Sequence, residues 1–237
     1  GIYLGPFSIQ SDAYGSWTLV EHVPLERYLK GVVPYEIGPN SPEAALAAQA
    51  VLARTWAIAN SHRFKVDGYN LCSDTQCQVY KDPSKADQKI KKAIQQTAGK
   101  ILTWNKKPIN TVYHATNGGV MASMAEAWSM ANVPYIKIIL DGPMDWVKEV
   151  KLPLFERSSV STLLASKKEA YGDNHYLYRW RRTYTADELK QAFKSFLKRN
   201  SFNSPQAIKV LKRGASGRVL SIEVAGFNNE LPVIIEL

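Results

Sequence analysis

The sequence predicts an α+β fold that forms one domain over residues 1–237, with strands at both ends and a long helix between them. Apolar and polar residues alternate over residues 1–22, which is the spacing of half-buried strands. An alanine-rich run of helix length follows the N-terminal strands, and neither an internal repeat nor a linker interrupts the chain. These observations favour a single α+β domain.

The N-terminal segment is expected to form two strands joined by a turn at Tyr14-Gly15-Ser16. Its alternating apolar residues are Ile2, Leu4, Phe7, Ile9, Trp17 and Leu19. A short helix over residues 25–33 is expected to follow.

A long helix is expected to begin at Ser41-Pro42, because serine is a favoured N-cap and proline fits the first helical position. The helix runs to about His62 and is rich in alanine, so neighbouring segments can approach its backbone closely. Gln49 and Arg54 are its unusual polar residues. They either face water or brace the loop that precedes the helix.

The rest of the chain is expected to alternate helices, turns and strands. The expected elements are a helix at 84–98 stopped by Gly99, a hairpin of 101–104 and 109–115, a turn at 126–130, a strand at 135–140, a loop-and-helix elaboration over 151–178, a helix at 185–198, and strands at 219–224 and 231–237 around a turn at 226–230.

The net charge of +9 at pH 7 favours an anionic partner such as nucleic acid, an anionic membrane surface or an acidic cell-wall polymer. No helix-turn-helix, zinc-finger or RNA-recognition pattern accompanies the basic residues, so nucleic acid is not expected. No apolar run approaches the roughly 18 residues that a membrane-spanning helix needs. The chain starts at Gly1 without a signal-like segment, as a mature or trimmed fragment does, so its start says nothing about its compartment.

Several common catalytic patterns are absent from the sequence. It contains no G-x-S-x-G, no H-E-x-x-H, no phosphate-binding loop and no G-x-G-x-x-G. The histidines, at positions 22, 62, 114 and 175, are widely scattered. A serine hydrolase and a zinc peptidase or zinc amidase are therefore not expected.

One carboxylate, Glu36, lies in a predicted turn bounded by Pro34 and Pro39, just ahead of the alanine-rich helix. Its sequence neighbours are mostly apolar, and a carboxyl group among apolar side chains is harder to ionise. A general acid that works near neutral pH needs this property. The simpler alternative is a carboxylate that caps or solvates the turn.

Cys72 and Cys77 are the only cysteines of the chain. Their spacing permits a disulfide in an oxidising compartment, a pair of free thiols, or half of a metal site. Gln76 stands beside Cys77, and the nearest upstream histidine is His62. Because structural zinc usually takes four ligands, a complete zinc site lacks obvious ligands here.

Several blocks follow one another in a recognisable order. VPLERYLKGVV begins at Val23, Glu36 follows it, and EAALAAQAVLARTWA begins at Glu43. Residues 80–119, AEAWSMANVPYIK at 125–137 and SGRVLSIEVAG at 216–226 come after them. In this order the blocks resemble the stage II sporulation protein D family, which includes the amidase enhancers. The resemblance covers most of the chain, and residues 151–178 are its family-variable part.

The resemblance implies a lytic transglycosylase that cleaves the β-1,4 bond between N-acetylmuramic acid and N-acetylglucosamine in peptidoglycan and leaves 1,6-anhydro ends. Such an enzyme needs one catalytic carboxylate, because the substrate's own C6 hydroxyl attacks, whereas hydrolytic glycosidases typically use two. Glu36 would act as general acid and then as general base, oriented by Gln49 or Arg54. Family members in sporulating bacteria act on glycan without stem peptides, together with an amidase.

With this resemblance, a substrate cleft is expected between the Glu36 loop and the turn that ends Tyr113-His114-Ala115-Thr116-Asn117-Gly118-Gly119. Glycine permits positive φ and lets a ligand approach backbone N–H donors, and aromatic side chains offer flat surfaces to sugar rings. An ordinary strand-end turn is the alternative. The expected substrate-binding residues are Tyr35, Gln49, Arg54, Tyr113, His114, Asn117, Gly118, Gly119, Glu126 and Trp128.

Two further functions stay open at this point: a non-catalytic activator of a peptidoglycan amidase, and a basic cell-wall-binding module. In each case the partner is peptidoglycan glycan, with an amidase as a possible second partner, and the location is extracytoplasmic. No cofactor is expected to be required for catalysis. Some members of the family hold zinc through cysteines and a histidine, so the resemblance allows a structural zinc at Cys72, Cys77 and His62.

Overall fold

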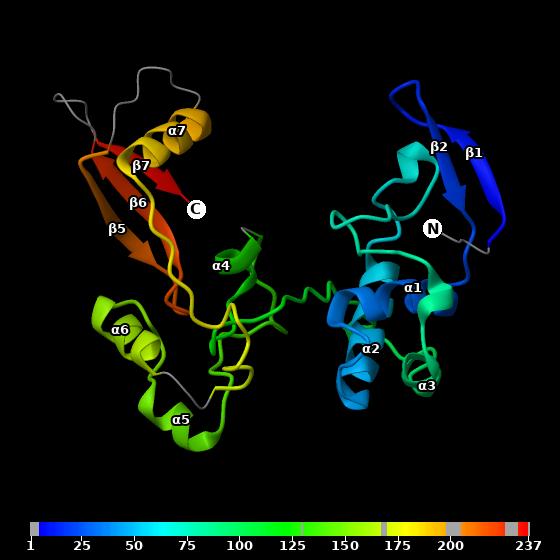
Figure 1. Ribbon diagram of the computed structural model, residues 1–237, viewed down its shortest axis with the longest axis horizontal. Helices are drawn as coiled ribbons and strands as arrows, with labels where there is room; N and C mark the ends of the chain where they lie inside the picture. The colour runs from blue at the N-terminus through cyan, green and yellow to red at the C-terminus, as the bar shows by residue number, and fades with distance from the viewer. Residues whose placement is uncertain (1–4, 129, 167–169, 198–204, 226–231, 237) are drawn as a thin grey trace. The chain divides into compact units, whose positions relative to one another are not determined.

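The chain divides after His114 into two compact units, Gly1–His114 and Ala115–Leu237 (Figure 1). The computed structural model describes residues 5–128, 130–166, 170–197, 205–225 and 232–236. Helices and small antiparallel sheets occur in both units, which agrees with the predicted α+β class. One domain over residues 1–237 was expected, because no linker in the sequence marks a division into two units.

The first unit begins with a hairpin of β1 (Phe7–Ser11) and β2 (Trp17–Glu21), which confirms the predicted strands (Figure 1). Ile9 lies opposite Leu19 in the antiparallel register. The apolar face points to solvent, contrary to expectation: Ile9, Trp17 and Leu19 are 70%, 72% and 65% exposed.

The other face of this hairpin carries the polar residues Ser8, Gln10 and Thr18 together with Val20. Ser8 Oγ lies 2.8 Å from Nε2 of His22, and Gln10 Nε2 donates to Ser8 Oγ at 3.2 Å. Ser8 and Gln10 are half-buried on this face. Ile2 and Leu4, which were expected in the same strands, lie outside the described residues.

Three helices build the core of the first unit: α1 (Leu25–Ile37), α2 (Glu43–Ala59) and α3 (Gln88–Gln96). The alanines of α2 let the other two helices approach it closely, as expected. Side chains of this core that are almost fully buried include Leu29, Val32, Val33, Leu46, Ala50, Ala53, Ile90 and Ile94.

The starts of two helices differ in detail from the prediction. Pro42 is the N-cap residue of α2, and Ser41 Oγ donates instead to the Ile37 carbonyl at 2.8 Å. The Asp87 side chain caps α3 by accepting the N–H of Ile90 at 2.9 Å, so α3 begins later than residue 84.

Short elements complete the first unit. They are the 3-10 turns η1 (Lys65–Asp67) and η2 (Pro83–Lys85) and the strands β3 (Thr103–Trp104) and β4 (Lys107–Pro108). Asn105 and Lys106 connect β3 to β4 with positive φ angles of 49° and 62°, as tight hairpin turns require. The predicted hairpin and its first strand are thus confirmed, but the second strand is wrong: β4 lies within the predicted turn, and residues 109–115 form no strand.

The second unit combines four described helices with a three-stranded sheet in the order β5-β6-β7 (Figure 1). The elements are α4 (Met124–Trp128), α5 (Met144–Glu149), α6 (Arg157–Ala165), α7 (Ala186–Leu197), β5 (Ala207–Arg213), β6 (Val219–Ala225) and β7 (Val233–Glu236). The prediction was correct for α7, β6 and β7 and missed α5 and β5.

Two predicted elements of this unit are wrong. Residues 126–130 were expected to form a turn, yet most of them belong to helix α4. Residues 135–140 make an isolated bridge between Leu140 and Val120 instead of a strand. The predicted turn at 226–230 lies outside the described residues.

A buried tryptophan centres the core that joins α5 and α6. Trp146 is fully buried, and its Nε1 donates to Ser166 Oγ at 2.7 Å. Val120, Leu154, Leu163 and Tyr178 pack in the same cluster. Among the described residues, no helix combines the length and the apolar character needed to cross a membrane.

Candidate functional site

Glu36 lies in the last turn of α1, whereas the sequence predicted a turn between Pro34 and Pro39. Pro34 is accommodated inside the helix, which continues to Ile37 and ends before Gly38 at a φ of 87°. Glu36 is half-buried and follows the buried Val33 closely. The helix therefore fixes the carboxylate at the border of the core.

An extended segment supplies a hydrogen-bond donor to this carboxylate. The Val79 N–H donates to Oε1 of Glu36 at 2.8 Å. Two residues further on, the Lys81 N–H donates to the Gly31 carbonyl of α1 at 2.9 Å. A Cβ at Gly31 would collide with the Lys81 carbonyl and the Tyr80 ring, so glycine is what lets the segment lie against the helix.

Tyr35 and Tyr113 were both expected to offer their rings to sugars. Tyr35 is half-buried, and its hydroxyl donates to the Asp82 carbonyl at 3.4 Å. The hydroxyl of Tyr113 points inward and accepts from Nε2 of Gln78 at 3.0 Å. Burial raises the pKa of Tyr113, and the neighbouring Glu36 carboxylate raises it further. The structure thus brings Tyr113 and Glu36 together.

Gln78 connects the half-buried Tyr113 to a buried tyrosine, Tyr28. Its side chain is 1% exposed, and its Oε1 accepts the hydroxyl of Tyr28 at 3.1 Å. Burial is also the main cause that raises the pKa of Tyr28. Neither Gln78 nor Tyr28 stands out in the sequence, because nothing in the pattern around them distinguishes a buried polar contact from a surface one.

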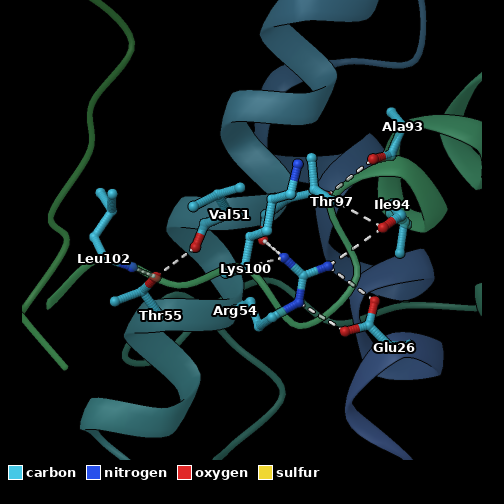
Figure 2. Close-up of polar contacts among 10 residues, drawn as sticks. Glu26, Val51, Arg54, Thr55, Ala93, Ile94, Thr97, Lys100 and Leu102 are labelled. Carbon is cyan, nitrogen blue, oxygen red and sulfur yellow. Dashed lines mark hydrogen bonds and ion pairs between the residues drawn. The ribbon is translucent and has the colours of Figure 1, made fainter.

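Arg54 does not brace Glu36, contrary to the prediction. It is 1% exposed and donates to both carboxylate oxygens of Glu26, as Figure 2 shows. Its remaining donors reach the carbonyls of Ala50, Ile94 and Lys100. The hydrogen bond from Arg54 is the main cause that lowers the pKa of Glu26. Arg54 therefore holds the fold of the first unit together, and all of these contacts are internal.

Gln49 is the second polar residue of α2 that was expected near Glu36. It is 6% exposed, and within the described part of the chain its Nε2 has no hydrogen-bond partner. A buried amide N–H without a hydrogen-bond partner lowers the stability of the fold, so Gln49 is an unusual residue at a buried helix position. Its role in orienting Glu36 stays a prediction.

The glycine pair adopts the positive φ angles that were expected, 67° at Gly118 and 95° at Gly119. Its N–H groups, however, are used within the turn. Gly118 donates to Thr116 Oγ1 at 3.2 Å, and Gly119 donates to Asn117 Oδ1 at 2.8 Å. The expectation that both amides face a ligand is therefore wrong, because the turn's own side chains bind them.

Asn117 also forms hydrogen bonds with other residues of the second unit. Its Nδ2 donates to Oδ2 of Asp141 at 2.6 Å, and its carbonyl accepts from Arg218 at 3.3 Å. The Gly118 carbonyl accepts from Arg179 at 2.8 Å. Asp141, Arg179 and Arg218 were missed by sequence reasoning, since each is distant from the turn along the chain.

The remaining predicted binding residues lie in different surroundings. His114 is exposed at the end of the first unit, and Trp128, at the end of α4, is 41% exposed. Glu126 in α4 accepts the Ser216 N–H at 3.5 Å. His114 and Trp128 are accessible enough to bind a ligand. The cleft that would join these residues to Glu36 stays a prediction.

Cys72 and Cys77 form a disulfide. A bonded pair offers no thiolate to a metal, and zinc binding needs deprotonated cysteine. His62 is exposed in the turn after α2, and the described residues contain no group of three His, Cys, Asp or Glu that could hold a metal ion. The three residues proposed as zinc ligands do not fit a zinc site in this structure.

A cavity of about 1020 Å³ lies in the first unit beside the β1–β2 hairpin. Leu19 of β2, Tyr28 of α1, Ile58 of α2 and the loop with Cys72 contribute to its lining. Glu36 is not among the lining residues. Tyr28 is the link between the two features, because it lines the cavity and bonds to Gln78.

Comparison with known families places Glu36 in a matched segment. Residues 13–104 match the family model described as Stage II sporulation protein, and residues 122–236 match one described as a domain of unknown function (DUF8618). The first unit therefore carries a domain of the stage II sporulation protein family. The sequence blocks suggested a resemblance to this family over most of the chain, but the family model covers only residues 13–104. The blocks at 125–137 and 216–226 lie in the segment that matches the second model.

Individual relatives carry related names. Stage II sporulation protein D of Bacillus subtilis (strain 168) is 35% identical over 137 residues, which cover 51% of this chain and 39% of that protein. The protein of that name from Bacillus amyloliquefaciens is 37% identical over 136 residues, with the same coverage. The amidase enhancer of Bacillus subtilis (strain 168) is 38% identical over 108 residues, covering 46% of this chain and 14% of that protein. The chain thus spans well under half the length of these relatives.

Proposed function

We propose that this protein is a lytic transglycosylase that cleaves the β-1,4 bond between N-acetylmuramic acid and N-acetylglucosamine of peptidoglycan, on strands without stem peptides. The observation that carries the proposal is the carboxylate of Glu36. It is half-buried and held by the Val79 N–H at 2.8 Å, within the segment that matches the sporulation protein family. A single fixed carboxylate suits a reaction in which the substrate supplies its own nucleophile.

In the first step Glu36 donates its proton to the glycosidic oxygen as the bond from that oxygen to C1 of the muramic acid breaks. In the second step the ionised Glu36 accepts the proton of the C6 hydroxyl while O6 bonds to C1. The 1,6-anhydro ring closes, Glu36 regains its proton, and no water is consumed. Intramolecular attack supplies much of the rate, because the reacting groups are already adjacent.

The charge of the chain suits this substrate. A net charge of +9 attracts an acidic wall polymer, and the attraction should weaken as salt screens exposed charges within about 8–10 Å. We accordingly place the protein outside the cytoplasm, at the cell wall, and propose that no cofactor takes part in the catalysis.

A second candidate function is activation of a peptidoglycan amidase without glycan cleavage. The observation that favours it is the 38% identity to a protein named amidase enhancer. In this case Glu36 would be dispensable, and the protein would act through binding to the amidase, to the glycan, or to both.

The test compares Glu36→Gln with Glu43→Gln on glycan strands stripped of stem peptides, with mass spectrometry of the products. Glu43 is an exposed carboxylate paired with Lys92 at 3.3 Å, so it is a matched control. Anhydro ends should form with wild type and Glu43→Gln and fall by about 10²–10⁴-fold with Glu36→Gln, because the amide cannot donate an acidic proton. Full activity of Glu36→Gln would disprove the assignment and make Glu126 the next carboxylate to test.

A second arm adds a purified peptidoglycan amidase to intact sacculi. If no variant yields anhydro ends, yet wild type and Glu36→Gln accelerate amide cleavage equally, the protein is an activator and the transglycosylase proposal fails.

A further inference from the structure

We propose that Tyr113 is a positioning residue for Glu36, with its hydroxyl donating to the carboxylate and with the direction of that hydrogen bond set by the buried Gln78. This inference rests on the proposed function for its catalytic consequence, while the contact itself can be tested without any activity.

The direction of the hydrogen bonds follows from a group that can act in only one way. The Ala53 carbonyl only accepts, so the atom of Gln78 that lies 3.4 Å from it is the donor Nε2. The same Nε2 lies 3.0 Å from the Tyr113 oxygen, to which it gives its second hydrogen. Oε1 of Gln78 is left to accept the hydroxyl of Tyr28 at 3.1 Å. Both ends of the amide are thus assigned.

Tyr113 therefore accepts with its oxygen, and its own hydrogen needs another acceptor. Gln78 and Val79 are consecutive: the side chain of the first holds Tyr113, and the backbone N–H of the second holds Glu36 at 2.8 Å. The phenol and the carboxylate are thus held by neighbouring residues of one segment. Burial first and the Glu36 charge second raise the pKa of Tyr113, while the hydrogen bond from Gln78 opposes them. A phenol that directs its proton at a carboxylate behaves in this way.

The arrangement suits a carboxyl group that must give a proton and then take one. The Val79 N–H can only donate, and the Tyr113 oxygen already accepts from Gln78, so neither group takes up the proton of Glu36. That proton stays available to the glycosidic oxygen. Once it has been given away, the two donors hold the resulting carboxylate in place for the second proton transfer.

The kinetic test uses Tyr113→Phe, which removes only the hydroxyl. Tyr80→Phe is the matched control: Tyr80 is 8% exposed and stacks on Tyr28 at 5.1 Å, and its hydroxyl donates to Glu21 at 2.9 Å. We expect kcat for anhydro-end formation to fall roughly tenfold in Tyr113→Phe, as the loss of a hydrogen bond to a charged group implies, with KM little changed. Tyr80→Phe should keep the wild-type kcat.

The second readout needs no catalysis. In protein labelled with ¹³C at the tyrosine ζ carbon, the Tyr113 resonance of the wild type should differ from that of Glu36→Gln, because the variant has no carboxylate to accept the phenol proton. Glu36→Gln should also let the Tyr113 phenolate form at lower pH, because the negative charge that opposes ionisation is gone.

The two readouts separate the proposals. If the wild type forms no anhydro ends while the Tyr113 resonance changes in Glu36→Gln, the proposed function fails and the contact stands. A Tyr113 resonance that is the same in wild type and Glu36→Gln, or a Tyr113→Phe enzyme with wild-type kcat, overturns the positioning role.

Discussion

Arg54 and Glu26 form a bidentate ion pair in which Nε and Nη2 of the arginine lie 2.7 and 2.8 Å from the two carboxylate oxygens (Figure 2). The pair is asymmetric, because the Arg54 side chain is 1% exposed and that of Glu26 is 42% exposed. Arg54 also donates to the carbonyls of Ile94 and Lys100. One guanidinium thus ties α1 and α2 to the end of α3.

Replacing Arg54 by methionine should lower the free energy of unfolding by about 3 kcal/mol, since it removes a buried cation and leaves carbonyls without donors. Glu26→Gln should cost less, because its site is partly hydrated. Denaturant unfolding of both variants measures the two losses. An unfolding curve like that of wild type, together with lost activity, would return Arg54 to the candidate site.

High pH should destabilise the protein through Tyr28, which is 7% exposed. The pKa of Tyr28 is raised in the folded state by burial. Because the pKa is raised in the folded state, Tyr28 contributes fully to the free energy of unfolding below about pH 10, the pKa of an unfolded tyrosine. This contribution is lost as the pH rises further. Tyr28→Phe should flatten this alkaline decline in thermal unfolding. Tyr14→Phe, at an 89% exposed position, should leave it unchanged.

Gly31→Ala should destabilise the first unit although alanine favours helices. The added methyl group would overlap the Lys81 carbonyl and the Tyr80 ring, and such overpacking costs about 1–3 kcal/mol against a helix-propensity gain of about 1 kcal/mol. The melting temperature should fall, and the activity should fall with it, because Val79 is displaced from Glu36. A higher melting temperature would show that the segment moves aside without cost.

The disulfide between Cys72 and Cys77 should be measurable in the purified protein. Thiol titration of the unreduced protein should read near zero, and reduction should lower the free energy of unfolding by about 2 kcal/mol, since the closed loop is short. Metal analysis tests the alternative, a zinc site at the two cysteines. About one zinc per chain in the reduced protein, with a chelator-sensitive melting temperature, would contradict the disulfide assignment.

Local patterns predicted the local features well. Alternation located β1 and β2, the alanine-rich run after Ser41-Pro42 located α2, and the period of apolar residues located α7. The helix α1 was ended too early, at Val33, because proline usually breaks a helix, whereas packing of the buried Val32 and Pro34 carries this one on to Ile37.

Long-range contacts could not be predicted in the same way. The partner of Arg54 lies 28 residues away in sequence, and Gln78 reaches Tyr113 across 35 residues. Sequence reasoning therefore singled out Glu36 and Tyr113 as separate candidates. The contacts that connect them, from the Gln78 side chain to Tyr113 and from the Val79 N–H to Glu36, cannot be predicted from local patterns. The same holds for the ion pair of Arg54 with Glu26.

The outward apolar face of the β1–β2 hairpin has a consequence for handling the protein. Trp17 and Leu19 present surface that water solvates poorly, and a two-stranded sheet leaves an outer edge on each strand. Concentrated samples are therefore expected to self-associate through this hairpin, and the effect should grow with salt as the repulsion of the +9 charge is screened. Light scattering across a dilution series identifies the concentrations at which rates and titrations report on single chains.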